Sequence, residues 1–532
     1  MHIVVDRRPE GVVFMDDDGS ETLIAADALP AAVAEREAEH PRWVWTDTAQ
    51  WYPALLAAGV RVERCHDLRL VDAIIAGIDG RVPRRGWAGA APTDDGALFA
   101  LDGTDAVPPR SAAREWARQQ QRLAAHPEPA RLALLAAAES AGALAAIEMH
   151  ATGLPWSAAE HDALLTAALG PRPAAGARPA ALAALAAEVE RRLDIGAVPI
   201  DSPPALVAAL RRAGLAVTSA RSSELRRIDH PAIEPLLQYK SLSRLHTANG
   251  WNWLDEWVRD GRFRPTYVPG GVVTGRWASD GGGALQLPRQ VRPAIVADPG
   301  WRLVVADAAQ LEPRILAALS GDAAMARAGA DVDLYAGIVA SGAVATREQA
   351  KVGMLGAMYG GTTGASAQVL PRLARAFPRA IAHVEAAARA GERGERVRTL
   401  LGRTSPAPTR RLSEAAASET GRPDTTGPAA RAWGRFTRNF VVQGTAAEWA
   451  LAWLAGVRRQ LWTAGTPVAA QPHLVFFVHD ELIVHCPENE VARTEAVLRS
   501  AAAEAGRLLF GDAPVSFPVS VSIVHRYSDA KG

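Results

Sequence analysis

The chain has 532 residues, of which 48% are hydrophobic and 22% are charged. This composition is typical of a globular protein and excludes a disordered, collagen-like or coiled-coil chain. At about 150 residues per domain, the length predicts three or four structural units. The 58 basic and 58 acidic side chains cancel, and a neutral total by itself argues against a nucleic-acid-binding protein.

The N-terminus and the cysteines predict the compartment. The first residues lack a basic segment followed by an apolar one, so no secretion signal is expected. No run of about 18 apolar residues is free of charges, so no membrane-spanning helix is expected. Two cysteines, Cys65 and Cys486, are too few for a disulfide framework or a cysteine-rich zinc site. We therefore expect a cytoplasmic protein.

Charge is unevenly distributed along the chain. Residues 1–50 contain eleven acidic and four basic side chains, and residues 372–411 contain ten arginines and three glutamates. A solvated surface is the simplest explanation of either run. Only three lysines occur, Lys240, Lys351 and Lys531. In so arginine-rich a chain, a retained lysine suggests a use for its compact point charge.

The first sixty residues are expected to alternate between strands and helices. A turn at residues 16–19 separates two apolar strands, Pro30 opens a helix, and residues 42–45 form another strand.

The rest of the chain is expected to be richer in helix. A helical pattern over 110–150 is interrupted at His126-Pro127-Glu128-Pro129, which is the expected domain boundary. Residues 130–262 continue this pattern. Residues 404–430 are rich in Pro, Thr, Ser and Gly and are expected to form a long surface loop.

The first segment that suggests chemistry is an apolar run over residues 301–306 that ends at Asp307, before a helical pattern. A carboxylate at the end of a buried strand costs free energy unless it is paired or binds a metal. The alternative is that Asp307 is only the N-cap of the helix.

The second segment is a helical pattern over residues 346–361 that begins at Thr346, a good N-cap, and ends at paired glycines. Four side chains at four-residue steps lie on one face: two cations, an apolar side chain and an aromatic ring. Such a stripe suits a nucleoside triphosphate, and the alternative is an amphipathic helix with a basic edge. The stripe consists of Arg347, Lys351, Leu355 and Tyr359.

The third segment is a pair of apolar strands around His479-Asp480-Glu481. This hairpin lacks the Gly or Asn that a tight turn prefers. An acid there, beside Asp307, would make a two-metal site for phosphoryl transfer. A solvated hairpin tip is the alternative.

These segments, in this order, resemble motifs A, B and C of the family A DNA polymerases, the family of bacterial DNA polymerase I. Motif A is similar to residues 307–314, motif B to residues 347–360, and motif C to residues 478–481. Thr274-Gly275-Arg276 with Leu285-Gln286-Leu-Pro288, and the segment from Arg435 to Glu448, resemble the regions of the family that contact DNA. The resemblance runs from about residue 130 to the C-terminus.

The resemblance implies a catalytic centre with two Mg²⁺ ions, or Mn²⁺ as a substitute, held by Asp307 and Asp480. One ion would lower the pKa of the primer 3′-hydroxyl, and the other would neutralise the leaving pyrophosphate. Lys351 would be the third catalytic residue, which protonates the leaving group.

The resemblance also implies a nucleotide site. Arg347 and Lys351 would hold the triphosphate, Tyr359 would lie by the templating base, and Glu312 would crowd a 2′-hydroxyl and so favour deoxynucleotides. The full set of expected nucleotide-binding residues is Arg347, Lys351, Leu355, Tyr359, Gln310 and Glu312.

Primer–template DNA is the implied macromolecular partner. Most of its ligands would bind minor-groove acceptors that all base pairs share, which checks shape and not sequence, while His479 would touch the primer strand. The expected DNA-binding residues are Arg276, Gln286, Arg435, Asn439, Gln443 and His479.

Three residues depart from the family pattern. Ala308 stands where an aromatic residue usually follows the motif A aspartate, and Leu355 where motif B has Phe or Tyr. Asp333 stands where the family has a histidine that touches the triphosphate. We expect these changes to affect nucleotide handling and to leave the chemistry intact.

The implied fold class is α+β: a right-hand polymerase of thumb, palm and fingers with an antiparallel palm sheet, preceded by a small α/β RNase H-like domain of the exonuclease type. Residues 1–128 would form the exonuclease-like domain and residues 129–532 the polymerase domain. Within the latter, the leading helix and thumb would span 129–262, the palm 263–320 and 440–532, and the fingers 321–439.

The N-terminal region resembles the 3′–5′ proofreading domain of the family in degraded form. The metal-binding aspartate of its second motif falls on Trp51. No Asp-x-Glu ends the first strands, since Asp16 and Asp18 fit a turn better. The third motif, Tyr-x₃-Asp, is absent because Leu56 follows Tyr52 at that spacing. We expect no exonuclease activity and no 5′-nuclease domain.

The expected function is template-directed DNA synthesis without proofreading, in DNA replication, repair or gap filling. The enzyme would be a cytoplasmic, nucleoid-associated monomer that uses deoxynucleoside triphosphates and binds no membrane. A single-subunit RNA polymerase shares motifs A to C, but Glu312 argues against it. A catalytically impaired DNA-binding paralogue is the other alternative, against which the intact Asp307, Asp480, Lys351 and Arg347 argue.

Overall fold

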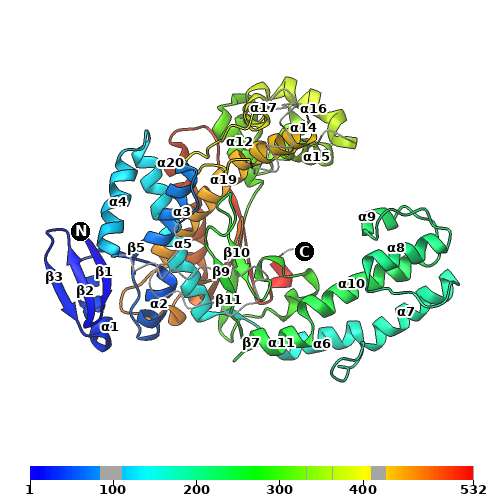
Figure 1. Ribbon diagram of the computed structural model, residues 1–532, viewed down its shortest axis with the longest axis horizontal. Coiled ribbons are helices and arrows are strands. Elements are labelled where there is room, and N and C mark those ends of the chain that lie inside the picture. The colour runs from blue at the N-terminus through cyan, green and yellow to red at the C-terminus, as the bar shows by residue number, and fades with distance from the viewer. Residues whose placement is uncertain (84–110, 331, 362–363, 409–426, 531–532) are drawn as a thin grey trace. The chain divides into compact units, whose positions relative to one another are not determined.

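The computed structural model describes residues 1–83, 111–330, 332–361, 364–408 and 427–530. The chain divides into two compact units (Figure 1). The first consists of Met1–Thr152, Thr266–Asp280 and Gly300–Ile523, and the second of Gly153–Pro265, Gly281–Pro299 and Val524–Gly532.

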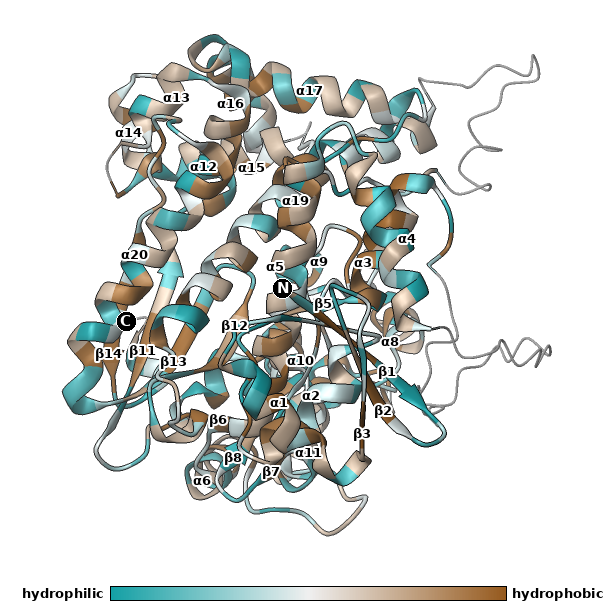
Figure 2. Ribbon diagram, turned by 90° about the vertical axis from the view of Figure 1, so that its left-hand side faces the viewer, coloured by the Kyte–Doolittle hydropathy of each residue, from teal (hydrophilic) through white to brown (hydrophobic). Residues whose placement is uncertain are grey.

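The N-terminal part of the first unit is built on a five-stranded sheet in the order β3-β2-β1-β4-β5. The first three strands are antiparallel, while β4 and β5 run parallel to β1. Side chains alternate between the faces of a strand. Ile3 therefore packs with Trp43 and Tyr52 on one face, and Val4 packs with Val44 on the other. The hydrophobic stretches of β1 and β2 are brown in Figure 2. The strands are β1 (His2–Arg8), β2 (Gly11–Asp16), β3 (Glu21–Ile24), β4 (Arg42–Trp45) and β5 (Arg64–Asp67).

Helices cover both faces of this sheet, and capping residues set their ends. The carboxylate of Asp67 accepts the Leu70 N–H at the start of α3, and Gly80, with φ of 71°, ends that helix. The α/β composition expected for this region, with the helix at Pro30 and the strand at 42–45, is confirmed. The helices are α1 (Leu29–Glu37), α2 (Thr48–Ala57), α3 (Leu68–Asp79), α4 (Ala112–Ala124) and α5 (Pro129–Thr152).

A second sheet of four strands, in the order β12-β13-β11-β14, carries the motif A and motif C segments. β13 pairs antiparallel with both β11 and β12, as expected for the palm. β11 is buried along Leu303–Ala306, which explains its continuous apolar sequence. The strands are β11 (Trp301–Ala308), β12 (His473–Val478), β13 (Glu481–Pro487) and β14 (Val519–Val524), and a two-stranded sheet is formed by β9 (Thr266–Val268) and β10 (Ala278–Asp280).

The longest helix among the described residues is α19, which at 34 residues extends for about 50 Å. Helices α5, α12, α15, α17 and α20 pack on it. Helices α5 and α19 are long and apolar enough to cross a membrane, but 72% and 78% of their most apolar windows are buried inside the protein, as in the core helices of a globular fold. The remaining helices of the unit are α12 (Leu311–Ser320), α13 (Ala323–Ala328), α14 (Leu334–Ala340), α15 (Arg347–Tyr359), α16 (Gly364–Ala376), α17 (Pro378–Glu392), α19 (Pro428–Leu461) and α20 (Val491–Phe510).

The expected surface loop at 404–430 lies largely outside the described residues. Residues 405–408 form no helix or strand, and α19 begins at Pro428.

The second unit is mainly helical, in line with the helical pattern expected over residues 130–262. Its core holds aromatic rings in contact: Trp156 lies 5.1 Å from Trp253 and 5.6 Å from Phe263 between ring centroids. Trp156 also donates a hydrogen bond to Nδ1 of His161. The elements are α6 (Ala158–Leu169), α7 (Ala180–Leu193), α8 (Pro203–Arg212), α9 (Ser222–Leu225), α10 (Ile233–Asn249), α11 (Trp251–Trp257), and the short strands β6 (Leu154–Pro155), β7 (Val258–Arg259) and β8 (Arg262–Phe263).

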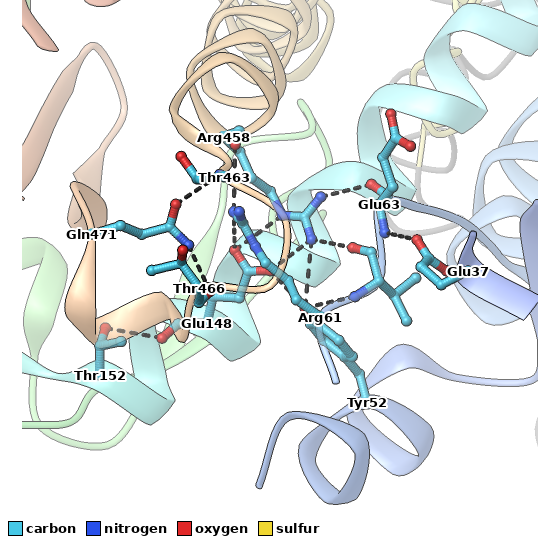
Figure 3. Close-up of polar contacts among 11 residues, drawn as sticks. Glu37, Tyr52, Arg61, Glu63, Glu148, Thr152, Arg458, Thr463, Thr466 and Gln471 are labelled. Carbon is cyan, nitrogen blue, oxygen red and sulfur yellow. Dashed lines mark hydrogen bonds and ion pairs between the residues drawn. The ribbon is translucent and has the colours of Figure 1, made fainter. Parts of the chain in front are cut away.

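A buried charge cluster joins the N-terminal sheet to α5 and α19 (Figure 3). Glu148 of α5 accepts hydrogen bonds from Tyr52 (2.6 Å), Arg61 (3.0 and 3.1 Å) and Arg458 of α19 (2.6 and 3.0 Å). Arg458 also donates to the backbone carbonyl of Glu63. Burial alone would raise the pKa of Glu148, but the two arginines lower it to about 2.

We expect Glu148→Gln to lower the free energy of unfolding by about 3–5 kcal/mol, because it leaves two buried guanidinium groups without their anion. The folded-state pKa lies below the ordinary 4.5. This stabilisation is therefore complete above pH 4.5 and is lost as the pH falls towards 2. Urea unfolding of wild type and variant at several pH values measures both effects. Glu490→Gln, which breaks an exposed pair with Arg493, is the matched control and should cost less than about 1 kcal/mol.

Candidate active site

Asp307 lies at the end of β11, one residue before the strand stops. Its Cα faces that of Glu481 in the antiparallel ladder with β13. The N-cap of α12 is Gln310, with φ of 46°, and not Asp307. The alternative interpretation of Asp307 as a helix cap is therefore wrong.

Asp480 is held beside the end of β11 by the backbone. The β12–β13 hairpin closes through His479 and Asp480, and His479 takes the left-handed conformation, with φ of 54°. The missing turn glycine is thus replaced by a histidine in a conformation that few non-glycine residues adopt. The Ala308 N–H donates to the Asp480 carbonyl at 2.8 Å, which brings the hairpin tip next to Asp307.

The two aspartates influence each other electrostatically. Burial and the charge of Asp307 together raise the pKa of Asp480 to about 6, against the opposing effect of Arg276. Burial, with Arg276, lowers the pKa of His479 to about 4. Two adjacent carboxylates repel each other when both are ionised. A hard divalent cation, which prefers oxygen ligands, suits such a pair. No group of three or more His, Cys, Asp or Glu side chains in the described part of the chain is arranged to hold a metal, so substrate or water would supply further ligands.

The expected stripe on α15 is present. Arg347, Lys351, Leu355 and Tyr359 are exposed, while the other side of the helix is buried. Thr346 caps the helix by accepting the Gln349 N–H at 3.2 Å. No carboxylate among the described residues lies within 4 Å of Lys351, which leaves its ammonium group available to a ligand.

Glu312 connects motifs A and B. The Tyr359 hydroxyl donates to both of its carboxylate oxygens, at 2.9 and 3.0 Å, and Arg276 donates to one of them at 2.5 Å. Burial and Glu312 raise the pKa of Tyr359, while its hydrogen bond with Asn439 lowers it. Four expected site residues therefore meet at one point.

Asp333 and Gln310 link motif A to the start of α15. Asp333 accepts a hydrogen bond from Nε of Arg347 at 2.7 Å, and the guanidinium carbon of Arg347 lies 5.5 Å from the ring centroid of Tyr335. Gln310 accepts the Leu334 N–H at 3.1 Å. Neither the Asp333 ion pair nor Tyr335 was predicted. The sequence contained an indication of the position of Asp333, because this residue precedes a helical pattern, as an N-cap residue does.

Three of the residues expected to bind DNA lie on one face of α19. Arg435 is exposed, and Asn439 and Gln443 are half-buried at four-residue steps on the same face. The side chain of Arg435 packs so closely on Gly360 that a Cβ there would lie 2.6 Å from it. Gln286 belongs to the second unit.

The positions that the proofreading motifs of the family would occupy carry other side chains. Trp51 is buried, its ring nitrogen donates to Thr46, and the guanidinium of Arg7 lies 4.6 Å from its ring. Asp6, near the end of β1, was not predicted; its carboxylate accepts the Ala112 N–H at 3.1 Å, and burial raises its pKa. Asp16 ends β2 at a turn, as expected.

A cavity of about 730 Å³ lies elsewhere in the first unit. Its lining consists largely of alanines and arginines, such as Ala138, Arg64 and Arg507, and includes no expected site residue.

Comparison with known families defines the class of protein. The model of the family "DNA polymerase family A" matches residues 205–529, and the chain belongs to this family. Among its relatives, DNA polymerase I of Chloroflexus aurantiacus is 29% identical over 57% of this chain and 33% of its own length. The thermostable DNA polymerase I of Thermus filiformis is 29% identical over 58% and 38%. The chain thus spans 33% and 38% of the length of these two relatives.

A solved structure has the same fold. The POL domain of Pol1 from M. smegmatis, in complex with DNA primer-template and dNTP, aligns with a TM-score of 0.73 and 20% identity, over all of this chain and 96% of that one. The expected α+β polymerase fold is confirmed.

We expect Asp307→Asn to lower the pKa of Asp480 from about 6 towards its ordinary value, because the variant removes a neighbouring charge. Carboxyl ¹³C titration of aspartate-labelled protein without divalent ions measures this pKa. Asp322→Asn, a helix cap away from the pair, should leave it unchanged. An Asp480 pKa that does not respond to Asp307→Asn would show that the two carboxylates are not coupled.

Proposed function

We propose that the protein is a DNA-directed DNA polymerase that extends a primer on a template with deoxynucleoside triphosphates. One observation carries the proposal: the backbone holds Asp307 and Asp480 side by side in a chain of the DNA polymerase A family. The M. smegmatis domain was solved with primer-template and dNTP, which supports the same partners here.

Asp307 and Asp480 would hold two Mg²⁺ ions, or Mn²⁺ in their place. Divalent ions there supply charge that stabilises a deprotonated primer hydroxyl and the leaving pyrophosphate. The charge of Asp307 helps to raise the pKa of Asp480, and the same excess of negative charge would attract a divalent cation.

The side chains on α15 would bind and orient the triphosphate. Arg347 offers a planar set of donors suited to phosphate oxygens. The exposed ammonium of Lys351 would bind the triphosphate and give a proton to the leaving pyrophosphate oxygen. Glu312, fixed by Tyr359 and Arg276, would occupy the space that a 2′-hydroxyl needs.

We expect Asp307→Ala and Asp480→Ala to abolish primer extension and to leave primer–template binding largely intact. The carboxylates organise metal, whereas DNA affinity comes from many cationic and groove contacts. Extension of an end-labelled primer, with DNA binding by fluorescence anisotropy in parallel, makes the test. A variant with a tenth or more of wild-type turnover would contradict the two-metal assignment.

Two matched reactions separate the alternatives. Ribonucleotides used as well as deoxynucleotides would favour the RNA polymerase, and DNA binding without extension by the wild type would favour the impaired paralogue. Glu481→Gln is the control variant at the hairpin and should have a smaller effect, since the main ligand in our proposal is Asp480.

We propose that the N-terminal domain has no proofreading activity. A carboxylate-bound metal is disfavoured where Arg7 covers Trp51 and Asp6 is bound to the start of α4. The domain would instead support the polymerase through the Glu148 cluster. Such an enzyme suits short synthesis, as in repair or gap filling, and we propose that it acts as a cytoplasmic, nucleoid-associated monomer.

The wild-type protein should not shorten a mismatched, end-labelled primer in Mg²⁺ without nucleotides. Two-metal hydrolysis needs clustered carboxylates, and these positions lack them. Asp307→Ala is the useful background, because it removes synthesis and leaves the N-terminal domain untouched. Mg²⁺-dependent shortening that Asp6→Ala removes would refute the proposal.

We expect the enzyme to prefer deoxynucleotides over ribonucleotides. This preference should be about 1–2 kcal/mol smaller than it would be with an aromatic residue at position 355. Leu355 is 38% exposed, on the same face of α15 as Tyr359, which contacts Glu312. Leu355→Phe should increase the preference for dATP over ATP opposite thymine, and Glu312→Ala should remove it. Leu355→Met controls for side-chain volume. Equal selectivity in wild type and Leu355→Phe would mean that Leu355 does not shape the sugar pocket.

A further inference from the structure

Arg347, the cation expected to bind the triphosphate, already forms an ion pair with Asp333. Nε of Arg347 donates to Asp333 at 2.7 Å, and the two side chains are 56% and 37% exposed. The Asp333 carboxylate also accepts the backbone N–H groups of Tyr335 (3.0 Å) and Ala336 (3.3 Å), which caps α14. Burial alone would raise the pKa of Asp333, but Arg347 and these N–H groups hold it below its ordinary value. Asp333 is thus a fixed negative charge at the start of α15.

Tyr335 holds Arg347 from another side. Its ring centroid is 5.5 Å from the guanidinium carbon, and the ring is 8% exposed. A cation over an aromatic face is attracted to it without any carboxylate. Arg347 would therefore keep its place at the start of α15 if Asp333 lost its charge.

We propose that Asp333 competes with the nucleotide triphosphate for Arg347 and so sets the affinity of the enzyme for incoming nucleotides. This inference rests on the proposed function of Arg347. The carboxylate accepts the Nε–H of Arg347, which is one of the donors that a guanidinium group offers to a phosphate. A nucleotide must displace the carboxylate or accept fewer bonds, and its phosphates also meet a like charge.

The effect belongs to nucleotide binding and not to the chemical step. Asp333 is the N-cap of α14, whereas the aspartates that would hold metal lie at the end of β11 and in the β12–β13 hairpin. Removal of an interaction that acts on the bound ground state and the transition state alike changes KM and leaves kcat unchanged.

Asp333→Asn is the informative variant, because asparagine retains the helix cap and loses the charge. We expect KM for dATP to fall about two- to fivefold, the range that an exposed ion pair supports, with kcat within twofold of wild type. The change should be absent in an Arg347→Ala background, as a double-mutant cycle requires for coupled residues. Glu348→Gln is the control, since it removes the same charge next to Arg347 from a residue that makes no ion pair with it among the described residues.

Calorimetric binding of Mg·dATP to the protein with a dideoxy-terminated primer–template separates this inference from the proposed function. Tighter dATP binding by Asp333→Asn, and not by Glu348→Gln, supports the inference even if no variant extends a primer. Extension by the wild type with unchanged or weaker dATP binding by Asp333→Asn would overturn the inference and leave the polymerase assignment standing. An equal effect of Glu348→Gln would also overturn it, because general charge would then explain the result.

Discussion

The site depends on one constraint: the backbone holds two carboxylates together that repel each other. The ladder between β11 and β13 fixes the end of one strand against the hairpin tip of the other, and the bond from Ala308 to the Asp480 carbonyl closes it. Burial and the charge of Asp307 together raise the pKa of Asp480. Because strand pairing extends over seven residue pairs, the sheet can keep the carboxylates close without any cation present.

Much of this arrangement could be predicted from the sequence. The apolar runs before Asp307 and around residues 479–481 identified the strands, and four-residue spacing identified the stripe on α15. These signals are local, since strand and helix periods decide which side chains share a face. The order of the three segments then indicated the family, and with it the fold.

The remaining features depend on contacts between distant parts of the chain. Arg458 and Glu148 are 310 residues apart in sequence, and nothing in either segment indicates the other. Asp333 and Arg347 are closer, but their contact depends on how α14 packs on α15. The left-handed conformations of Gln310 and His479 also escaped prediction, because residues other than glycine rarely adopt them. The sequence could indicate candidate residues, but the partners that they contact could be identified only from the structure.

Helix α19 connects two distant parts of the first unit, so that a tilt at one end of the helix moves the other end. Arg435 lies near its start and Arg458 near its end, about 35 Å apart at the rise of an α-helix. A tilt of about one degree at the Glu148 cluster would move Arg435 by about 0.6 Å along this length, a sizeable part of a hydrogen bond's tolerance. The N-terminal region, through its contacts with Arg458, therefore fixes the angle of the helix that we propose faces the DNA.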